Sequence, residues 1–239
     1  MAAKTVGGKG VVSRIKRPRS LTSIVVDQIR DLIITGKLAL GEQLSENTIA
    51  EMLGVSRTPV RDAFLRLEAE RLVEVKPQRG TFVFDYDANV LREMCELRKI
   101  LEIGAMQAAL RSGRAALVAA LRARVEAAES AMPEGPSAYQ AHDTNFHETL
   151  VRASENHELI EAYNRISGRI RAVRYRLTRS QSQISVSQRT HRAIVDALDA
   201  GDDATAESEL ARHVYNSHRF FLKQGDGNNE PASAFGAAL

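Results

Sequence analysis

Four residues in the second half of the chain carry side chains of the kind that bind divalent metal ions: Asp143, His147, His191 and His213. Each falls on a helical stripe that is otherwise apolar. Asp143 and His147 share a stripe with Phe146 and Leu150, His191 with Ile194, Val195 and Leu198, and His213 with Leu210 and Val214. A carboxylate and three imidazoles that face one helical interior are costly to bury without partners. A divalent cation satisfies all four together, so the pattern predicts a metal site inside a helical bundle.

The sequence leaves other interpretations of these residues open. Each histidine alone could be a hydrogen-bonded core residue, but His142, His157 and His218 do not share the apolar stripes so clearly. A metal held by this set could activate water in a metallohydrolase, although the bundle offers no paired carboxylate as a separate general base. The ion could also be purely structural, or it could itself be the signal of a metal-responsive protein.

One carboxylate and three neutral imidazoles leave a divalent ion with a net positive charge and, in five- or six-coordinate geometry, with open positions. This arrangement favours a small carboxylate as ligand, held also by a nearby arginine. The candidates for that second contact are polar side chains on neighbouring predicted helices: Arg98, Arg171, Arg174 and Asn216. For the arginine-rich run at 169–176, a solvated basic face is the alternative.

The stretch 53–67 predicts a tight turn followed by a helix that begins after Ser56, a suitable N-cap. Its apolar side chains recur at helical spacing on one face, at Val60, Phe64 and Leu67. The polar side chains at its N-terminal end are those of Arg57, Thr58 and Arg61. With a second helix just upstream, this is the geometry that enters a DNA major groove, where Ser56 could also hold a backbone phosphate. An amphipathic helix with solvated arginines is the alternative.

A short hairpin follows this helix. Residues 72–75 and 81–84 are rich in β-branched and aromatic side chains, which predicts two strands with a turn at 76–80. Lys76, Arg79 and Gly80 lie at the tip. The hairpin therefore predicts a two-stranded wing whose Arg79-Gly80 tip reaches phosphates or the adjacent minor groove.

Helical patterns account for the rest of the ordered chain. We predict a first helix at 21–36 and a second one capped by Ser45. After the wing the strand signal disappears, and helices are predicted at about 87–112, 115–131, 137–154, 156–179, 184–200 and 202–223. The fold class is therefore mostly α, with an N-terminal winged helix-turn-helix and an all-α bundle of about six helices.

Composition bounds the possible functions of the 239-residue chain. The chain is 44% hydrophobic, enough for one large or two modest cores. A single cysteine, Cys95, excludes a disulfide framework and fits a reducing compartment. No apolar run approaches the roughly 18–20 residues of a membrane span, and the N-terminus lacks the apolar core of a secretory signal. We therefore expect a cytoplasmic protein with no membrane partner.

Positive charge is concentrated at the N-terminal end. Residues 1–85 carry 14 Lys/Arg and 10 Asp/Glu, whereas residues 86–239 carry 19 and 20. The surplus lies with the predicted helix-turn-helix, as a polyanionic partner requires. Residues 1–20 hold six Lys/Arg and no acid, which favours a disordered basic tail, and the Gly/Asn/Ala-rich segment 225–239 favours a flexible one.

Residues 38–46, 53–61 and 72–83 closely resemble the N-terminal domain of GntR-family transcription regulators, with the run Gly-Val-Ser-Arg-Thr-Pro-Val-Arg as the most specific match. The chain departs from the family pattern at Leu40, where relatives often have proline, and at Asn47, where they often have arginine. Residues 143–147, 191–194 and His213 resemble the FCD domain of FadR-type members. In its metal-binding branch, the matching aspartate and three histidines hold the ion, and the position of Arg98 resembles that of an arginine facing the effector pocket.

We therefore expect a transcription regulator and not an enzyme, with a winged helix at 21–85 and an effector-binding, dimerising bundle at 86–224. Zinc is the favoured ion, with nickel and manganese as alternatives. One winged helix reads too few base pairs to specify a unique site in a genome. A homodimer on an inverted-repeat operator in double-stranded DNA is therefore expected, as the resemblance also implies. A small organic acid would control operator affinity, with repression relieved by the effector as the commoner family pattern.

Overall fold

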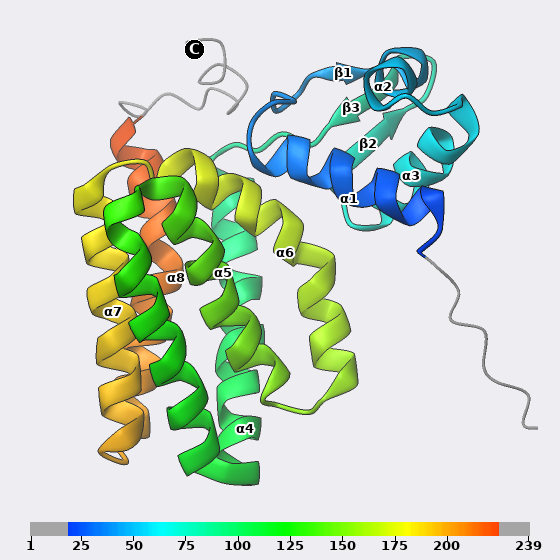
Figure 1. Cartoon of the computed structure of the whole chain (residues 1–239). Helices are drawn as coiled ribbons and strands as arrows, with labels where there is room; N and C mark the ends of the chain where they lie inside the picture. Colours follow the sequence, from blue (N-terminus) through cyan, green and yellow to red (C-terminus); the bar gives the residue numbers. More distant parts are fainter. Residues whose placement is uncertain (1–18, 225–239) are drawn as a thin grey trace, which may run out of the picture.

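The computed structural model describes residues 19–224, so the basic segment 1–18 and the tail at 225–239 lie outside the described residues. Figure 1 shows a small N-terminal winged helix beside a larger helical bundle. The winged helix consists of α1 (Leu21–Ile34), β1 (Gln43–Leu44), α2 (Glu46–Leu53), α3 (Arg57–Ala69), β2 (Val73–Lys76) and β3 (Gly80–Val83). The bundle consists of α4 (Ala88–Ala131), the short 3-10 helix η1 (Met132–Glu134), α5 (Pro136–Arg152), α6 (His157–Leu177), α7 (Gln181–Asp199) and α8 (Asp203–Gln224).

Local sequence signals place the helix-turn-helix. The Ser45 side chain accepts a hydrogen bond from the Thr48 amide and caps α2, and Gly54 ends α2 in the left-handed conformation at φ 64°. Helix α3 begins after Ser56 as predicted, but the Ser56 side chain makes no capping hydrogen bond. The apolar face of α3 is buried, with Val60 and Phe64 packed into the core of the winged helix.

The wing contains one strand more than predicted. Strands β2 and β3 pair antiparallel, from Val73 opposite Val83 to Lys76 opposite Gly80. The two-residue strand β1 pairs with the other side of β3, which gives the sheet order β1-β3-β2. Two residues are too few to show the alternation that marks a strand in a sequence, which is why β1 was not predicted. The strand forms because β3 offers it a free edge.

The predicted break at Ser112-Gly113 folds α4 back on itself. Gly113 leaves helical geometry (φ 172°, ψ 92°) and divides α4 into two arms. Next to the break, Gln107 and Arg114 bind Glu207 and Asp203 of early α8. At the far end of the second arm, Ala128 packs with Tyr139 and Ile184. The two arms therefore run antiparallel, as Figure 1 shows from the teal arm to the green one.

Helix α7 begins earlier than predicted. We expected it to start at residue 184 after a Ser/Gln-rich break, but the helix runs from Gln181. Ser180 and Gln183 form a capping box, in which each side chain bonds the other residue's backbone amide. The polar residues that resembled a loop are thus the signal that starts the helix. Within the described residues, no helix combines the length and apolar character needed to cross a membrane.

Helix α6 joins the winged helix to the bundle. The Arg176 guanidinium donates to the carbonyls of Ile33, Ile34 and Leu38, where α1 ends and the following loop begins. A cation at this end of a helix also interacts favourably with the helix dipole. Two turns earlier on α6, Arg169 lies over the Phe84 ring, with 5.2 Å from Cζ to the ring centroid. The position of the winged helix therefore depends on the second half of α6.

We expect Arg176→Met to lower the free energy of unfolding by about 1–3 kcal/mol, because carbonyls at the end of α1 lose a charged hydrogen-bond donor. Urea denaturation measures the change. Arg179→Met is the matched control, because Arg179 is exposed just past the end of α6. Equal effects of the two substitutions would contradict the assigned role of Arg176.

Candidate functional site

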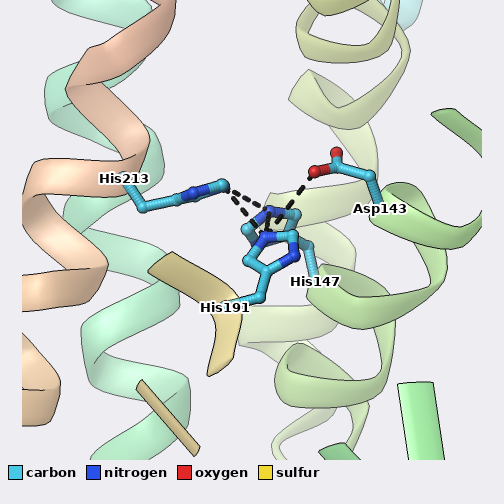
Figure 2. A group of neighbouring side chains, drawn as sticks. All are labelled: Asp143, His147, His191 and His213. Atoms are coloured by element: carbon cyan, nitrogen blue, oxygen red, sulfur yellow. Dashed lines mark hydrogen bonds and ion pairs between the residues drawn. The ribbon is translucent and has the colours of Figure 1, made fainter. Parts of the chain in front are cut away.

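The structure brings the four predicted metal ligands together in the core of the bundle (Figure 2). Asp143 and His147 come from α5, His191 from α7 and His213 from α8, and none is more than 5% exposed. One ligand atom from each residue can be chosen so that all four atoms lie within 4.8 Å of one another. The Phe146 ring stacks on His191 at 4.0 Å between centroids and holds that imidazole in place.

The three histidines point their Nε2 atoms at one another. The distances are 3.0 Å between His147 and His213, 3.1 Å between His191 and His213, and 3.3 Å between His191 and His147. Asp143 Oδ1 lies 3.6 Å from the His191 Nε2. Metal–nitrogen distances of about 2.0–2.1 Å place adjacent ligands about 2.9 Å apart in octahedral and about 3.3 Å apart in tetrahedral geometry. The triangle of nitrogens therefore has the size of a divalent metal site.

Hydrogen bonds at the far side of two rings fix their tautomers. His147 Nδ1 lies 2.9 Å from Glu102 Oε2, and a carboxylate accepts, so this nitrogen carries the hydrogen. His213 Nδ1 lies 3.4 Å from Thr190 Oγ1, whose own hydrogen goes to the Val186 carbonyl. Both rings thus present a lone pair at Nε2, and those lone pairs face each other at 3.0 Å. Such a contact repels unless a cation lies between the two nitrogens.

Burial and charge keep the ligands in the states that bind metal. Burial lowers the pKa of His191 to about 4 and holds the pKa values of His147 and His213 well below the ordinary value. Burial alone would raise the pKa of Asp143, but the charge of Arg174 together with those of other nearby groups outweighs it and keeps that pKa below the usual range. Arg174 Nη1 lies 2.6 Å from Asp143 Oδ2. At neutral pH the site therefore holds three neutral imidazoles and a carboxylate.

A small pocket opens beside this cluster. Its lining is polar and comes from five helices: Arg98, Gln140, Asp143, Arg174, Thr178, Ser187, His213 and Asn216. Three of the four predicted effector contacts, Arg98, Arg174 and Asn216, are among them. The fourth, Arg171, does not line the pocket. Burial and the neighbouring Arg174 charge lower the pKa of Arg171, and the carboxylates of Glu148 and Asp31 partly offset these effects.

Glu102, which we did not predict as a site residue, links the two halves of the site. Its Oε1 accepts hydrogen bonds from Arg98 Nε at 2.6 Å and from the Tyr163 hydroxyl at 3.2 Å, while its Oε2 accepts from His147. The side chain is fully buried. Its place four residues after Arg98 puts both on one helical face, and that spacing is the signal by which the sequence could have identified it.

We expect Glu102→Gln to weaken metal affinity by about 10- to 100-fold, because a carboxylate that orients a ligating histidine and raises its basicity is lost. Competition with a chromophoric zinc chelator measures the affinity. Glu161→Gln, an exposed change on α6, serves as the matched control. An unchanged affinity in Glu102→Gln would mean that His147 is not a ligand or is oriented by other contacts.

The predicted DNA-reading side chains lie on one exposed face of the winged helix. Ser56, Arg57 and Thr58 are exposed at the start of α3. Arg61 makes two 2.9 Å hydrogen bonds to the Glu46 carboxylate, and Arg57 lies 3.7 Å from the same group. We did not predict Glu46 as part of this surface. Glu46 belongs to the neighbouring helix α2, and its carboxylate is the shared partner of Arg57 and Arg61.

The wing tip requires glycine for two reasons. Gly80 has φ 108°, a backbone conformation that residues with a side chain rarely adopt. A Cβ at this position would also lie 2.8 Å from Gln43 Nε2. The same Gln43 amide donates to the Arg79 carbonyl at 3.0 Å and ties the tip to the base of the sheet. The Arg79 side chain is left exposed beside it.

An exposed helix-turn-helix with a basic wing, joined to a bundle that encloses a ligand pocket, defines a ligand-responsive DNA-binding regulator. Residues 21–83 match the family described as bacterial regulatory proteins, gntR family, and residues 93–216 match the FCD domain. The chain thus belongs to the GntR family of bacterial transcription regulators and carries an FCD domain.

Relatives and solved structures agree with this assignment. The chain is 35% identical over 202 residues to a probable D-xylose utilization operon transcriptional repressor of Paenarthrobacter nicotinovorans, covering 82% of this chain and 88% of that protein. It is 34% identical over 151 residues to the Uxu operon transcriptional regulator of Escherichia coli K12, covering 56% and 59%. The structure of E. coli McbR/YncC has the same fold, with a TM-score of 0.74 at 23% identity, over 87% of this chain and all of that one. The protein is therefore a DNA-binding transcriptional regulator.

Proposed function

We propose that this regulator binds a small carboxylate next to a divalent metal ion in the bundle, and that this binding controls its affinity for operator DNA. The observation that carries the proposal is the convergence of three buried imidazole lone pairs and one carboxylate beside a pocket with two guanidiniums. Asp143, His147, His191 and His213 would hold the ion, which would supply a Lewis-acidic contact for the carboxylate. Three nitrogen donors and one oxygen favour zinc, with nickel or manganese as alternatives.

The two arginines have separate roles in this proposal. Arg174 Nη1 lies 2.6 Å from the Asp143 carboxylate, which neutralises its charge, and its Nη2 donates to Thr144 at 2.7 Å, while Nε and Nη1 have no hydrogen-bond partner among residues 19–224. Arg98 Nη2 is buried and has no hydrogen-bond partner among residues 19–224. Leaving a buried charged donor unpaired is costly, and an incoming carboxylate would satisfy it. We therefore propose Arg98 Nη2 as an anchor for the ligand, with Asn216 also lining the pocket.

Residues 21–85 would then read DNA, and residues 86–224 would bind the effector and pair with a second copy. A homodimer would place two α3 helices on the half-sites of an inverted repeat. The ligand would favour one arrangement of the two winged helices and change their fit to the half-site spacing. The relative from Paenarthrobacter nicotinovorans is described as a repressor, which favours repression here as well. We propose no catalytic role for the metal.

Measuring operator binding while metal and carboxylate are varied independently tests the proposal. An operator selected from a random-sequence DNA pool is titrated with protein that is metal-free, metal-loaded, or metal-loaded with a panel of small carboxylates. The proposal expects release only in the last case. Release or tighter binding on adding metal alone would favour metal sensing. If metal-loaded protein with one ion per chain responds neither to the metal nor to any carboxylate, the metal is purely structural.

A further inference from the structure

The Glu46 carboxylate occupies one edge of the Arg61 guanidinium. Oε1 accepts a hydrogen bond from Arg61 Nε and Oε2 accepts one from Nη2, both at 2.9 Å, so the contact is bidentate. Glu46 is the first residue of α2 and Arg61 lies in the second turn of α3. The planar fork of an arginine matches a carboxylate in this way. Arg61 is therefore held in one orientation although its side chain is 61% exposed.

The other edge of the same guanidinium is left free. Glu46 takes one hydrogen from Nε and one from Nη2, and Nη1 makes no hydrogen bond within residues 19–224. An arginine reads guanine by donating two parallel N–H groups to O6 and N7. The Nη1–Nη2 edge of Arg61 still offers such a pair. Glu46 thus fixes the direction of the edge that can read a base and leaves that edge available.

Glu46 also lowers the positive charge at the start of α3. Arg57 Nη2 lies 3.7 Å from Glu46 Oε2, so one carboxylate pairs with two guanidiniums. The hydrogen bond from Arg61 is the main cause that holds the pKa of Glu46 below its ordinary value, so the carboxylate is ionised at neutral pH. Free guanidiniums bind phosphates of any sequence, and a carboxylate repels those phosphates. Contacts between this surface and unrelated DNA are therefore weakened.

We propose that Glu46 is a positioning residue that sets the DNA specificity of the regulator. It aims the free edge of Arg61 at the bases and withholds Arg57 and Arg61 from the phosphates of unrelated sequences. This inference rests on the proposed reading face of α3 and adds a residue of α2 to it. An acidic side chain on a DNA-binding surface lowers the total affinity, but specificity is a difference between two affinities and rises when unrelated DNA loses more.

Two substitutions at position 46 separate the charge from the geometry. Glu46→Gln keeps the size of the side chain and removes its charge. Glu46→Asp keeps the charge and withdraws the carboxylate from Arg61 by one methylene. Fluorescence anisotropy on the metal-loaded, full-length protein measures the affinities for a selected operator and for a scrambled duplex over a series of salt concentrations. Glu51→Gln is the matched control, because Glu51 is exposed on the same helix and forms no ion pair with the described residues.

Glu46→Gln should bind the scrambled duplex more tightly than the wild type does. The slope of log affinity against log salt should steepen by about 0.9 for each guanidinium released onto a phosphate. The ratio of operator to scrambled affinity should fall at least about fivefold, the low end of what a bidentate arginine–base contact contributes. Glu46→Asp should lower the same ratio with little change in the scrambled affinity. Glu51→Gln should leave the ratio unchanged.

A double-mutant cycle with Arg61→Ala shows whether Glu46 acts through Arg61. On the Arg61→Ala background, most of the effect of Glu46→Gln on the ratio should be lost. A full effect on that background would mean that Glu46 contacts DNA itself and would overturn the positioning role.

The remaining outcomes separate this inference from the proposed reading face. An unchanged ratio in both Glu46 variants would overturn the inference, and so would equal losses of operator and scrambled affinity, which indicate a purely structural role in α2. Circular dichroism establishes that the variants are folded, and Glu46→Asp keeps the negative charge at the start of α2 if Glu46→Gln is destabilised. An unchanged ratio in Arg61→Ala alone would instead contradict the reading face itself.

Discussion

Replacing His147 and His213 together with alanine should remove essentially all bound metal from the purified protein. The wild type should carry about one divalent ion per chain, since the cluster offers one set of four donors. The double variant keeps Asp143 and His191, and two donors are too few to hold a labile ion through purification. Inductively coupled plasma mass spectrometry on both proteins measures the metal content.

The control for this experiment is His142→Ala/His157→Ala, which removes two histidines that lie outside the cluster. It should keep the wild-type metal content. Circular dichroism and size-exclusion chromatography establish that each variant is folded. If the wild type takes up no ion even after incubation with zinc, nickel and manganese, the metal-assisted pocket is wrong, whereas the assignment as a DNA-binding regulator is unaffected.

Arg57→Ala should abolish specific operator binding and leave metal content unchanged. A bidentate contact between an arginine and a base is worth about 1–3 kcal/mol of discrimination, which corresponds to roughly 5- to 150-fold in affinity for each half-site. A protein with two half-sites would lose this contact twice. Fluorescence anisotropy with the operator and with a scrambled duplex, at fixed salt, separates specific from non-specific affinity.

Arg66→Ala is the matched control on the same helix. Arg66 is exposed near the end of α3 and bonds Ser23 of α1, away from the N-terminal end that carries Arg57. The Arg66→Ala substitution should reduce the affinities for the operator and for the scrambled duplex slightly and equally. Survival of specific binding in Arg57→Ala, or a larger loss in Arg66→Ala, would show that another face of α3 reads the bases.

The sequence determined the features that depend on local spacing. Helical periodicity placed Asp143, His147, His191 and His213 on inward-facing stripes, and the structure brings these stripes together. Capping and turn residues located α3 and the hairpin of the wing. These predictions succeed because a helix face and an N-cap are defined by residues only a few positions apart.

Contacts between distant segments were decided only by the tertiary structure. Arg171 and Arg174 lie on adjacent turns of α6, and both looked equally suited to hold the effector. Helix α6 packs against the bundle on one side and against the winged helix on the other, so two faces are buried where the sequence suggested one. Arg174 consequently meets Asp143, whereas Arg171 does not line the pocket beside the metal cluster.

The same reason explains the other misses. Strand β1 forms because β3 offers it an edge, and Glu46 reaches Arg61 from the neighbouring helix α2. Glu102 joins Arg98 on its own helix to His147, which is 45 positions away in the chain. The sequence determined which side chains each helix presents to the interior, and the packing of the helices decided which of them meet, because that choice depends on how several apolar faces fit together at once.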